Sequence, residues 1–196
     1  MTMSAEKTRT ARATPGGGGN SIYHSVAIAV MVVGVILGFA VLPRWFRASE
    51  GGALSGKPGP DFQLELVANA PQMGQRTLAL NEYKGKAVVL DFWATWCGPC
   101  QAQSPVLDKL AHRYESQGVA VVGINTSDAP GAAAKWARSH QITYPIVFDD
   151  EGETSHAYGV SNLPTLVILS REGKVVAVRE GFTDASELES ILKRVL

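Results

Sequence analysis

The fold of this chain is decided by one continuous stretch, Ala87-Val88-Val89-Leu90-Asp91-Phe92-Trp93-Ala94-Thr95-Trp96-Cys97-Gly98-Pro99-Cys100. Its first half is an apolar run, which predicts a buried strand over residues 87–93. After it, apolar residues recur with helical spacing at Val106, Leu107, Leu110, Ala111 and Tyr114. The two cysteines of the chain therefore stand, at dithiol spacing, where a strand passes into a helix.

This position predicts a reactive cysteine pair. At a helix N-terminus the unpaired backbone N–H groups and the helix dipole favour a thiolate, and the thiolate is the nucleophile in disulfide exchange. Cys97 stands at the helix start and is expected to face solvent. Cys100 follows one turn later, buried and close enough to close a small disulfide ring. The pattern indicates a redox-active Cys97–Cys100 disulfide.

Two structural uses of the pair compete with this interpretation. A purely structural disulfide usually closes a longer loop, where the entropic stabilisation is greater. A zinc site needs about four nitrogen or sulfur ligands. The chain has no second C-x-x-C, and its histidines fall in different elements, at His24, His112, His140 and His156. We therefore expect no metal site and no cofactor.

The residues around the cysteines resemble a known family. Residues 91–100 are very similar to the active-site segment of thioredoxins, and residues 58–64 and 81–89 resemble the membrane-tethered TlpA/ResA-like branch of that superfamily. The resemblance covers the chain from about residue 58 to its C-terminus. It implies an α/β thioredoxin fold with an N-terminal strand extension and an inserted strand–helix segment around residues 126–150.

Hydrophobic periodicity and turn residues divide this region into alternating elements. We expect strands over 61–66, 76–80, 87–93, 119–125, 145–148, 165–169 and 174–180. We expect helices from Cys97 to about residue 117, over 132–140, as a single turn over 153–158, and after Asp184. Asp184 and Glu187 form a capping-box-like pair at the start of the last helix. Trp93 and Trp136 are expected in the core.

A second group of site residues follows from the resemblance. Ser161-Asn162-Leu163-Pro164-Thr165 resembles the thioredoxin-fold loop whose proline is cis and lies against the active-site sulfurs. A cis Pro164 would turn the backbone of Leu163 toward the dithiol, free to pair with an extended substrate. Cis bonds occur at only about 5–6% of X–Pro positions, so an ordinary trans proline is the alternative. We expect the substrate-binding residues to be Trp96, Gly98, Pro99, Leu163 and Pro164.

Asp91 is the third catalytic candidate. A carboxylate in an apolar strand is costly, and burial should raise its pKa. The resemblance implies that Asp91 exchanges protons with Cys100; the alternative is a strand residue paired with backbone donors or water. Two positions depart from the family. Gly123 replaces the lysine that thioredoxins place near this aspartate, and Gln103 replaces a glutamate of ResA-like members.

The N-terminal part has a different composition. Residues 1–21 are polar and glycine-rich, which predicts a flexible cytoplasmic tail. Residues 22–42 contain no Asp, Glu, Lys or Arg, and their length matches the roughly 20 residues of a transmembrane helix. A cleavable signal peptide would have a shorter apolar core and small residues at its end. We therefore expect one retained transmembrane anchor, a linker over 43–57 and a thioredoxin-like domain over 58–196.

The predicted function combines these features. Lys7, Arg9 and Arg12 precede the apolar run and lean toward an internal N-terminus, and the resemblance places the catalytic domain on the extracytoplasmic, periplasmic side of the cell membrane. The 18 basic and 18 acidic residues balance, which argues against nucleic acid as a partner.

The Gly98-Pro99 dipeptide is that of thioredoxin, whose potential is about −270 mV against about −120 mV for the oxidant DsbA. We expect a reductant of disulfide-containing proteins, for example apocytochrome c in cytochrome c maturation, supplied with electrons by a membrane thiol donor.

Two other functions stay open at this point. A peroxiredoxin-like peroxidase would carry P-x-x-x-T-x-x-C, whereas the positions before Cys97 are Leu90 and Ala94. A copper-binding chaperone of the same fold typically uses C-x-x-x-C with a distant histidine, for which His156 is the only candidate.

Overall fold

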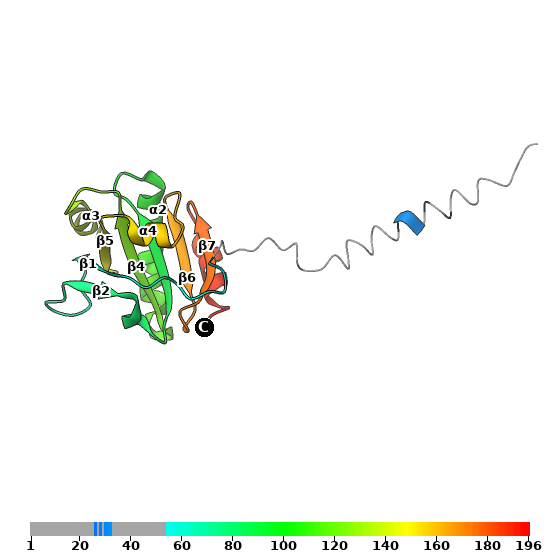
Figure 1. Cartoon of the computed structure of the whole chain (residues 1–196), viewed down its shortest axis with the longest axis horizontal. Coiled ribbons are helices and arrows are strands. Elements are labelled where there is room, and N and C mark those ends of the chain that lie inside the picture. Colours follow the sequence, from blue (N-terminus) through cyan, green and yellow to red (C-terminus); the bar gives the residue numbers. More distant parts are fainter. Residues whose placement is uncertain (1–25, 27, 29, 33–53) are drawn as a thin grey trace, which may run out of the picture. The chain divides into compact units, whose positions relative to one another are not determined.

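A computed structural model describes residues 26, 28, 30–32 and 54–196 of the chain (Figure 1). The predicted tail over 1–21 lies outside the described residues, as do most of the predicted anchor over 22–42 and of the linker over 43–57. The residues described within 22–42 are helical. In the described part of the chain, no helix combines the length and the apolar character needed to span a bilayer. The anchor stays a prediction.

The region from residue 54 onward alternates strands and helices around one sheet. In chain order its elements are β1 (Gln63–Ala68), β2 (Thr77–Ala79), the 3-10 helix η2 (Leu80–Tyr83), β3 (Ala87–Trp93), α2 (Gly98–Tyr114), η3 (Glu115–Gln117), β4 (Val119–Thr126), α3 (Ala132–His140), β5 (Ile146–Asp149), α4 (Glu153–Ala157), β6 (Thr165–Leu169), β7 (Val175–Glu180) and α5 (Ala185–Leu192). The strands lie in the order β2-β1-β5-β4-β3-β6-β7. β3, β4 and β5 are parallel, and the remaining pairings are antiparallel.

The sheet is covered on both faces, and each face has its own apolar cluster. One cluster joins Val89 and Trp93 of β3 to residues of α2, α3 and α5, among them Leu107, Trp136 and Leu188. The other joins the alternate residues of β3 to Phe62, Leu80 and Tyr158. Figure 1 shows α4 lying across the second face. Since side chains alternate along a strand, Asp91 shares the face of Val89 and Trp93, which is the face that α2 covers.

β3 is an interior strand, paired on both sides, and it is apolar except for Asp91. All of its residues are buried, as a strand covered on both faces requires. Its register sets Asp91 opposite Gly123 of β4 and Leu166 of β6. A Cβ atom on Gly123 would lie 3.0 Å from Tyr144 Cε2 and 3.1 Å from Trp93 Nε1. The lack of a side chain at Gly123 therefore lets two aromatic rings close over this part of the sheet.

Most of the expected elements are confirmed, and 87–93, 132–140 and 165–169 match to the residue. The first two strands exist but differ in their bounds: the first spans Gln63–Ala68, two residues later than the predicted 61–66, and the second is Thr77–Ala79, within the predicted 76–80. The second ends early because the Glu82 carboxylate accepts the backbone N–H of Ala79, 2.7 Å away, and the chain turns into η2.

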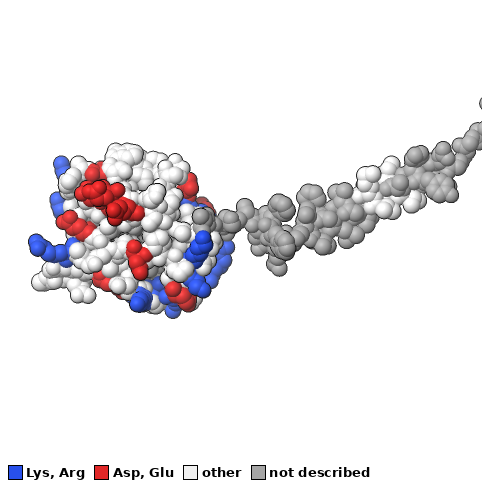
Figure 2. All heavy atoms as spheres, viewed as in Figure 1, with Lys and Arg blue, Asp and Glu red and all other residues white. Residues whose placement is uncertain are grey.

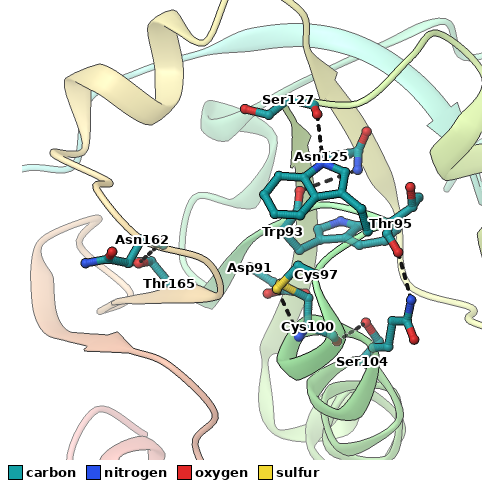
Figure 3. Close-up of a disulfide and its surroundings, with 12 residues drawn as sticks. Asp91, Trp93, Thr95, Cys97, Cys100, Ser104, Asn125, Ser127, Asn162 and Thr165 are labelled. Atoms are coloured by element: carbon teal, nitrogen blue, oxygen red, sulfur yellow. Dashed lines mark hydrogen bonds between the residues drawn. A yellow bond between two sulfur atoms is a disulfide. The ribbon is translucent and has the colours of Figure 1, made fainter.

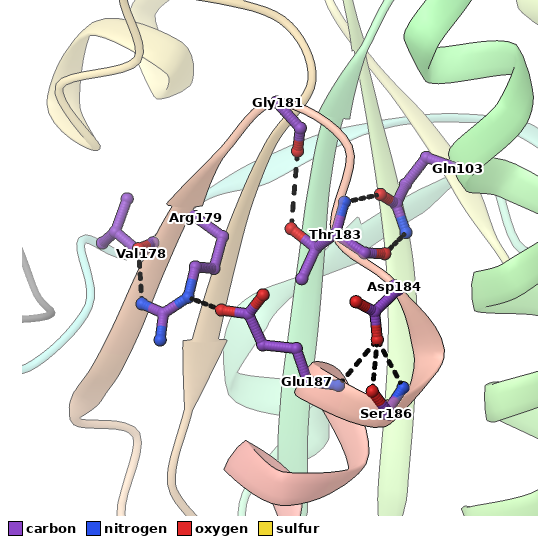
Figure 4. Close-up of polar contacts among 8 residues, drawn as sticks. All are labelled: Gln103, Val178, Arg179, Gly181, Thr183, Asp184, Ser186 and Glu187. Carbon is purple, nitrogen blue, oxygen red and sulfur yellow. Dashed lines mark hydrogen bonds and ion pairs between the residues drawn. The ribbon is translucent and has the colours of Figure 1, made fainter.

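The start of α5 confirms one half of the expected capping pair (Figure 4). The Asp184 carboxylate accepts the backbone N–H groups of Ser186 and Glu187, at 2.8 and 3.0 Å. Glu187 does not reach back to the cap. Its carboxylate instead binds Arg179 Nε of β7 at 2.5 Å, which ties α5 to the sheet. A cation on the neighbouring strand thus competes with the backbone for this carboxylate.

The packing at Gly123 gives a first prediction. Gly123→Ala should lower the free energy of unfolding by about 1–3 kcal/mol, because the added methyl group has no room between Tyr144, Trp93 and Ile146. The matched control is Gly98→Ala, where a Cβ would meet no atom within 4 Å. Chemical denaturation of the oxidised full-length variants measures both. Equal losses in the two variants would contradict a tight contact at Gly123.

Candidate active site

Cys97 and Cys100 form a disulfide at the N-terminus of α2, with their Cα atoms 5.2 Å apart. Cys97 is the N-cap of the helix, and its sulfur accepts the backbone N–H of Cys100 at 3.2 Å. Pro99 follows in the first turn, where a missing N–H costs nothing. This geometry confirms the predicted strand-to-helix placement and gives the Cys97 sulfur a hydrogen-bond donor that would stabilise a thiolate.

The two sulfurs differ in exposure. Cys97 is 5% exposed and Cys100 is fully buried. Cys100 is buried as expected, whereas the expectation that Cys97 faces solvent is wrong: Cys97 is also buried, although less deeply than Cys100. Gly98 and Pro99 beside it are exposed, so a partner can approach the Cys97 side of the disulfide.

The loop before Cys97, which contains Thr95 (Figure 3), is held by one carboxylate from the segment that follows β4. Asp128 follows β4, and its two carboxylate oxygens accept the backbone N–H and the hydroxyl of Thr95, both at 2.7 Å. The side-chain amide of Asn125 donates to the same carboxylate at 2.7 Å. Gln101 of α2 donates to the Thr95 carbonyl at 2.8 Å. These bonds fix the backbone that delivers Cys97 to the helix start.

Trp96 lies on the rim of the site, as predicted. Its side chain is 65% exposed, and its indole N–H donates to the Ser127 carbonyl at 2.9 Å. Trp93 is fully buried against Trp136, with ring centroids 4.9 Å apart. The two tryptophans that flank the cysteines therefore differ in role: Trp93 packs in the core, and Trp96 offers an aromatic surface to a partner.

The Leu163–Pro164 peptide bond is cis, as the sequence motif predicted. Thr165, the next residue, is in register with Phe92 of β3, so Pro164 lies level with the end of that strand. Figure 3 draws Asn162 and Thr165, which flank the bond, in the surroundings of the disulfide. Leu163 is half-buried, and Pro164 is buried. The loop therefore stands at the same end of the sheet as the cysteines.

A shallow groove of about 500 Å³ runs beside Trp96 and Leu163. Its lining mixes apolar and polar side chains and contains no Asp, Glu, Lys or Arg: Trp96, Thr126, Ser127, Gly152, Ser155, His156, Val160, Ser161, Asn162 and Leu163. Figure 2 shows an uncharged area at the corresponding end of the molecule, whereas acidic and basic side chains alternate elsewhere on that face.

Phe182 is a second exposed aromatic residue near the Pro164 loop. It is 51% exposed, and its neighbour Gly181 donates a backbone hydrogen bond to the Pro164 carbonyl at 2.8 Å. Glu180, at the end of β7, accepts the side-chain amide of Asn162 at 2.9 Å. Phe182 was not predicted, because the contact joins two loops that only the β6–β7 pairing brings together.

Asp91 lies fully buried on the face of β3 that α2 covers, the face that also holds both cysteines. Burial raises the pKa of the Asp91 carboxyl to about 7, and the hydrogen bond from Tyr144 opposes that shift. The Tyr144 hydroxyl donates to Asp91 Oδ2 at 3.3 Å, while Oδ1 has no hydrogen-bond partner among the described residues. The predicted rise in pKa is therefore confirmed, and the carboxyl titrates where a proton acceptor near neutral pH is needed.

Gln103 does not face the thiols as a free polar group. Its side-chain oxygen accepts the backbone N–H of Thr183 at 2.7 Å, and its amide donates to the Thr183 carbonyl at 3.1 Å (Figure 4). Both functional ends of Gln103 therefore hold the loop before α5 against α2. This is a structural use of the residue that stands where ResA-like proteins have a glutamate.

Two further residues of the site were missed from the sequence. Asp128 follows β4, and a signal for it existed, since the carboxyl ends of neighbouring parallel strands meet at the same edge of a sheet. Tyr144 precedes β5, and only the strand order β5-β4-β3 shows that it can reach across to Asp91. In the described part of the chain, no cluster of three or more His, Cys, Asp or Glu side chains could hold a metal ion.

Comparison with known proteins agrees with this geometry. Residues 55–178 match the AhpC/TSA family. The chain is 30% identical over 166 residues to the thiol-disulfide oxidoreductase ResA of Bacillus subtilis, covering 85% of this chain and 89% of that one. It is 28% identical to the ResA of Bacillus thuringiensis over 176 residues, or 90% and 97% of the two chains.

Solved structures of related proteins have the same fold. A candidate thiol:disulfide interchange protein DsbE from Chlorobium tepidum superposes with a TM-score of 0.65 at 31% identity, over 72% of this chain and 96% of that one. A DsbF homologue from Corynebacterium diphtheriae superposes with a TM-score of 0.63 at 27% identity, over 70% and 86%.

The pKa of Asp91 gives a second prediction. A carboxyl whose pKa rises from about 4 in the unfolded chain to about 7 in the folded protein stabilises the fold most at low pH. That contribution, on the order of 4 kcal/mol, should fall away between about pH 4 and pH 7 and stay absent above. Asp91→Asn should remove this dependence and make the oxidised protein more stable than wild type at pH 8.

Denaturation of both proteins across this pH range measures the difference. The control is Asp149→Asn, which alters a buried carboxylate that accepts the backbone N–H groups of Thr154 and Ser155 and the Ser155 hydroxyl. This variant should be less stable than wild type at neutral pH, because an amide cannot accept all three bonds. If the difference in free energy of unfolding between wild type and Asp91→Asn does not change with pH, Asp91 is not a buried group that titrates in this range.

Proposed function

The chain belongs to the ResA-type thiol–disulfide oxidoreductases of the AhpC/TSA family, and we propose that it works as a membrane-anchored, extracytoplasmic reductant of protein disulfides. The observation that carries the proposal is the Cys97–Cys100 disulfide at the N-terminus of α2, with Cys97 as the helix cap between exposed neighbours and Cys100 fully buried one turn further on.

The proposed cycle starts from the reduced dithiol. The Cys97 thiolate attacks one sulfur of a substrate disulfide, forms a mixed disulfide and releases the other substrate sulfur as a thiolate. Cys100 then passes its proton to Asp91 and attacks the Cys97 sulfur. This step forms the Cys97–Cys100 disulfide and releases the second substrate sulfur. Two electrons pass from enzyme to substrate, and a thiol donor must return them.

The groove beside Trp96 supports a protein chain as the substrate. Trp96 and Phe182 offer exposed apolar surface near the Pro164 loop, and no Asp, Glu, Lys or Arg lines the groove beside Trp96. Such a surface suits an extended polypeptide held by backbone hydrogen bonds and apolar contacts rather than by charge. Leu163, before the cis bond, is the residue we propose to pair with it. An unfolded secreted protein such as an apocytochrome c fits this description.

The direction and place of the reaction rest on two sequence features. Gly98-Pro99 between the cysteines is the dipeptide of thioredoxin, a reductant with a potential of about −270 mV. The uncharged run over 22–42 supports a membrane anchor, which would hold the domain close to a membrane thiol donor. No observation on the described residues favours the peroxidase or the copper chaperone as a second function.

The third prediction tests the order of attack. Cys100→Ser should accumulate a mixed disulfide with a protein substrate through Cys97, because no thiol remains to resolve it. Cys97→Ser should trap little. Alkylation of each single-cysteine variant against pH should give Cys97 the lower pKa, below the roughly 8.5 of a free cysteine. Faster alkylation of Cys100 at neutral pH would reverse the assigned roles.

The fourth prediction tests the anchor and its orientation. Full-length protein should keep its N-terminus and need detergent for extraction, whereas residues 58–196 should be soluble and active. The chain has only two cysteines, so a membrane-impermeant thiol reagent reports the side of the domain directly when it is applied to intact cells carrying Cys100→Ser, after a reductant has released any mixed disulfide. We expect Cys97 to be labelled. A mature protein that begins beyond residue 42 would show that the apolar run is a signal peptide.

A further inference from the structure

The face of β3 beneath the disulfide contains an acid without a basic partner. Asp91 is fully buried, and its neighbours in register are Gly123 and Leu166. From the start of α2 the titratable side chains on this face are the two cysteines. Burial and the Tyr144 hydroxyl are the influences that set the pKa of the Asp91 carboxyl. Among the described residues, Tyr144 is therefore the one whose side chain donates a hydrogen bond to this carboxyl.

Tyr144 occupies the space that position 123 leaves open. A Cβ on Gly123 would lie 3.0 Å from Tyr144 Cε2 and 3.2 Å from Ile146 Cγ1, so a longer side chain at this position and the tyrosine ring exclude one another. The ring is buried, and its hydroxyl donates to Asp91 Oδ2 at 3.3 Å. The tyrosine thus brings a hydrogen-bond donor from the segment before β5, across β4, to Asp91 of β3.

Ser104, one turn after Cys100 in α2, lies near the same hydroxyl. Its Oγ donates to the Cys100 carbonyl at 3.1 Å, and the residue is fully buried. The pKa of Tyr144 is raised chiefly by burial and by the Asp91 carboxyl; Ser104 opposes that rise, and Asp108, one turn further along α2, adds to it. Polar residues of α2 therefore lie close to the hydroxyl that binds Asp91.

We propose that Tyr144 is the positioning residue for Asp91: its hydroxyl holds Oδ2 and leaves Oδ1 as the oxygen that accepts the proton of Cys100. The inference rests on the proposed role of Asp91 as proton acceptor in resolution. In that step the Cys100 proton moves to Oδ1, the Cys97–Cys100 bond forms, and the bond between Cys97 and the substrate sulfur breaks. Tyr144 itself neither gains nor loses a proton.

The hydrogen bond has a defined effect on the carboxyl. A donor to the charged form favours that form, so Tyr144 opposes the rise in the Asp91 pKa that burial causes. At 3.3 Å the bond is longer than usual for a hydroxyl donor, and it has room to shorten when the carboxyl becomes negative. Because a neutral hydroxyl stabilises an anion less than a cation does, Asp91 stays protonated up to near-neutral pH.

The direct test is the fifth prediction. Tyr144→Phe keeps the ring on Gly123 and removes the donor. The pKa of Asp91, followed by carboxyl-carbon NMR in oxidised full-length protein, should rise from about 7 in wild type by about one unit in Tyr144→Phe.

The control is Tyr158→Phe, which removes another buried hydroxyl with a single bond, to the Pro60 carbonyl at 2.8 Å, from the opposite face of the sheet. It should not move the Asp91 titration. An Asp91 pKa that is unchanged or lower in Tyr144→Phe would overturn the inference.

Kinetics separate this inference from the proposed function. The midpoint of the pH profile of mixed-disulfide decay should rise by about one pH unit in Tyr144→Phe. The variant should decay roughly tenfold more slowly than wild type at pH 6, and the two rates should converge above about pH 9. In an Asp91→Asn background, Tyr144→Phe should cause no further shift.

If the mixed disulfide of Asp91→Asn decays like that of wild type, the role of Asp91 in the proposed function fails, and the positioning role of Tyr144 fails with it. If Asp91→Asn is slow but Tyr144→Phe keeps the wild-type pH profile, only the role of Tyr144 is overturned.

Discussion

The site depends on one requirement: Cys97 must cap α2 while its backbone continues directly from β3. The sulfur can accept the Cys100 N–H only if the loop over 94–96 ends at the first turn of the helix. Asp128 enforces this by accepting both hydrogen-bond donors of Thr95, its backbone N–H and its hydroxyl. Gln103 fixes the other side of the helix to the loop before α5. The reactivity of the dithiol is thus set by contacts that do not touch the sulfurs.

A second constraint is the burial of Asp91, whose hydrogen bonding differs from that of the other buried carboxylate, Asp149. Asp149 is also a buried carboxylate, but it accepts three hydrogen bonds from Thr154 and Ser155. Asp91 has a single bond, from Tyr144, and an oxygen without a partner. A structural carboxylate would be satisfied as Asp149 is. The poor satisfaction of Asp91 stores free energy in a group whose pKa lies near neutrality, which is typical of a functional acid.

The sequence predicted the fold and the reactive pair well because both depend on local patterns. The apolar run of β3, the helical spacing after Cys97 and the loop before Thr165 are each readable within a short window, and all were confirmed. The hydrogen-bond partners were not readable. Glu187 binds Arg179 instead of its own helix cap, and Gln103 binds the backbone of Thr183, because those partners become neighbours only in the folded chain.

Tyr144 shows the same limit in its sharpest form. Gly123 could be recognised as a departure from the thioredoxin pattern, and the sequence alone suggested that Asp91 simply lacks a partner there. The structure shows that the space is filled: the absence of a side chain at Gly123 of β4 allows the Tyr144 ring, from the segment before β5, to reach the carboxyl. The glycine that removes a cation from this position thus also makes room for a hydroxyl donor. Since Gln103 is bound to the Thr183 backbone, Asp91 is the acceptor that we propose for the proton of Cys100, and in the same proposal the Tyr144 hydroxyl tunes the pH at which Asp91 can accept it.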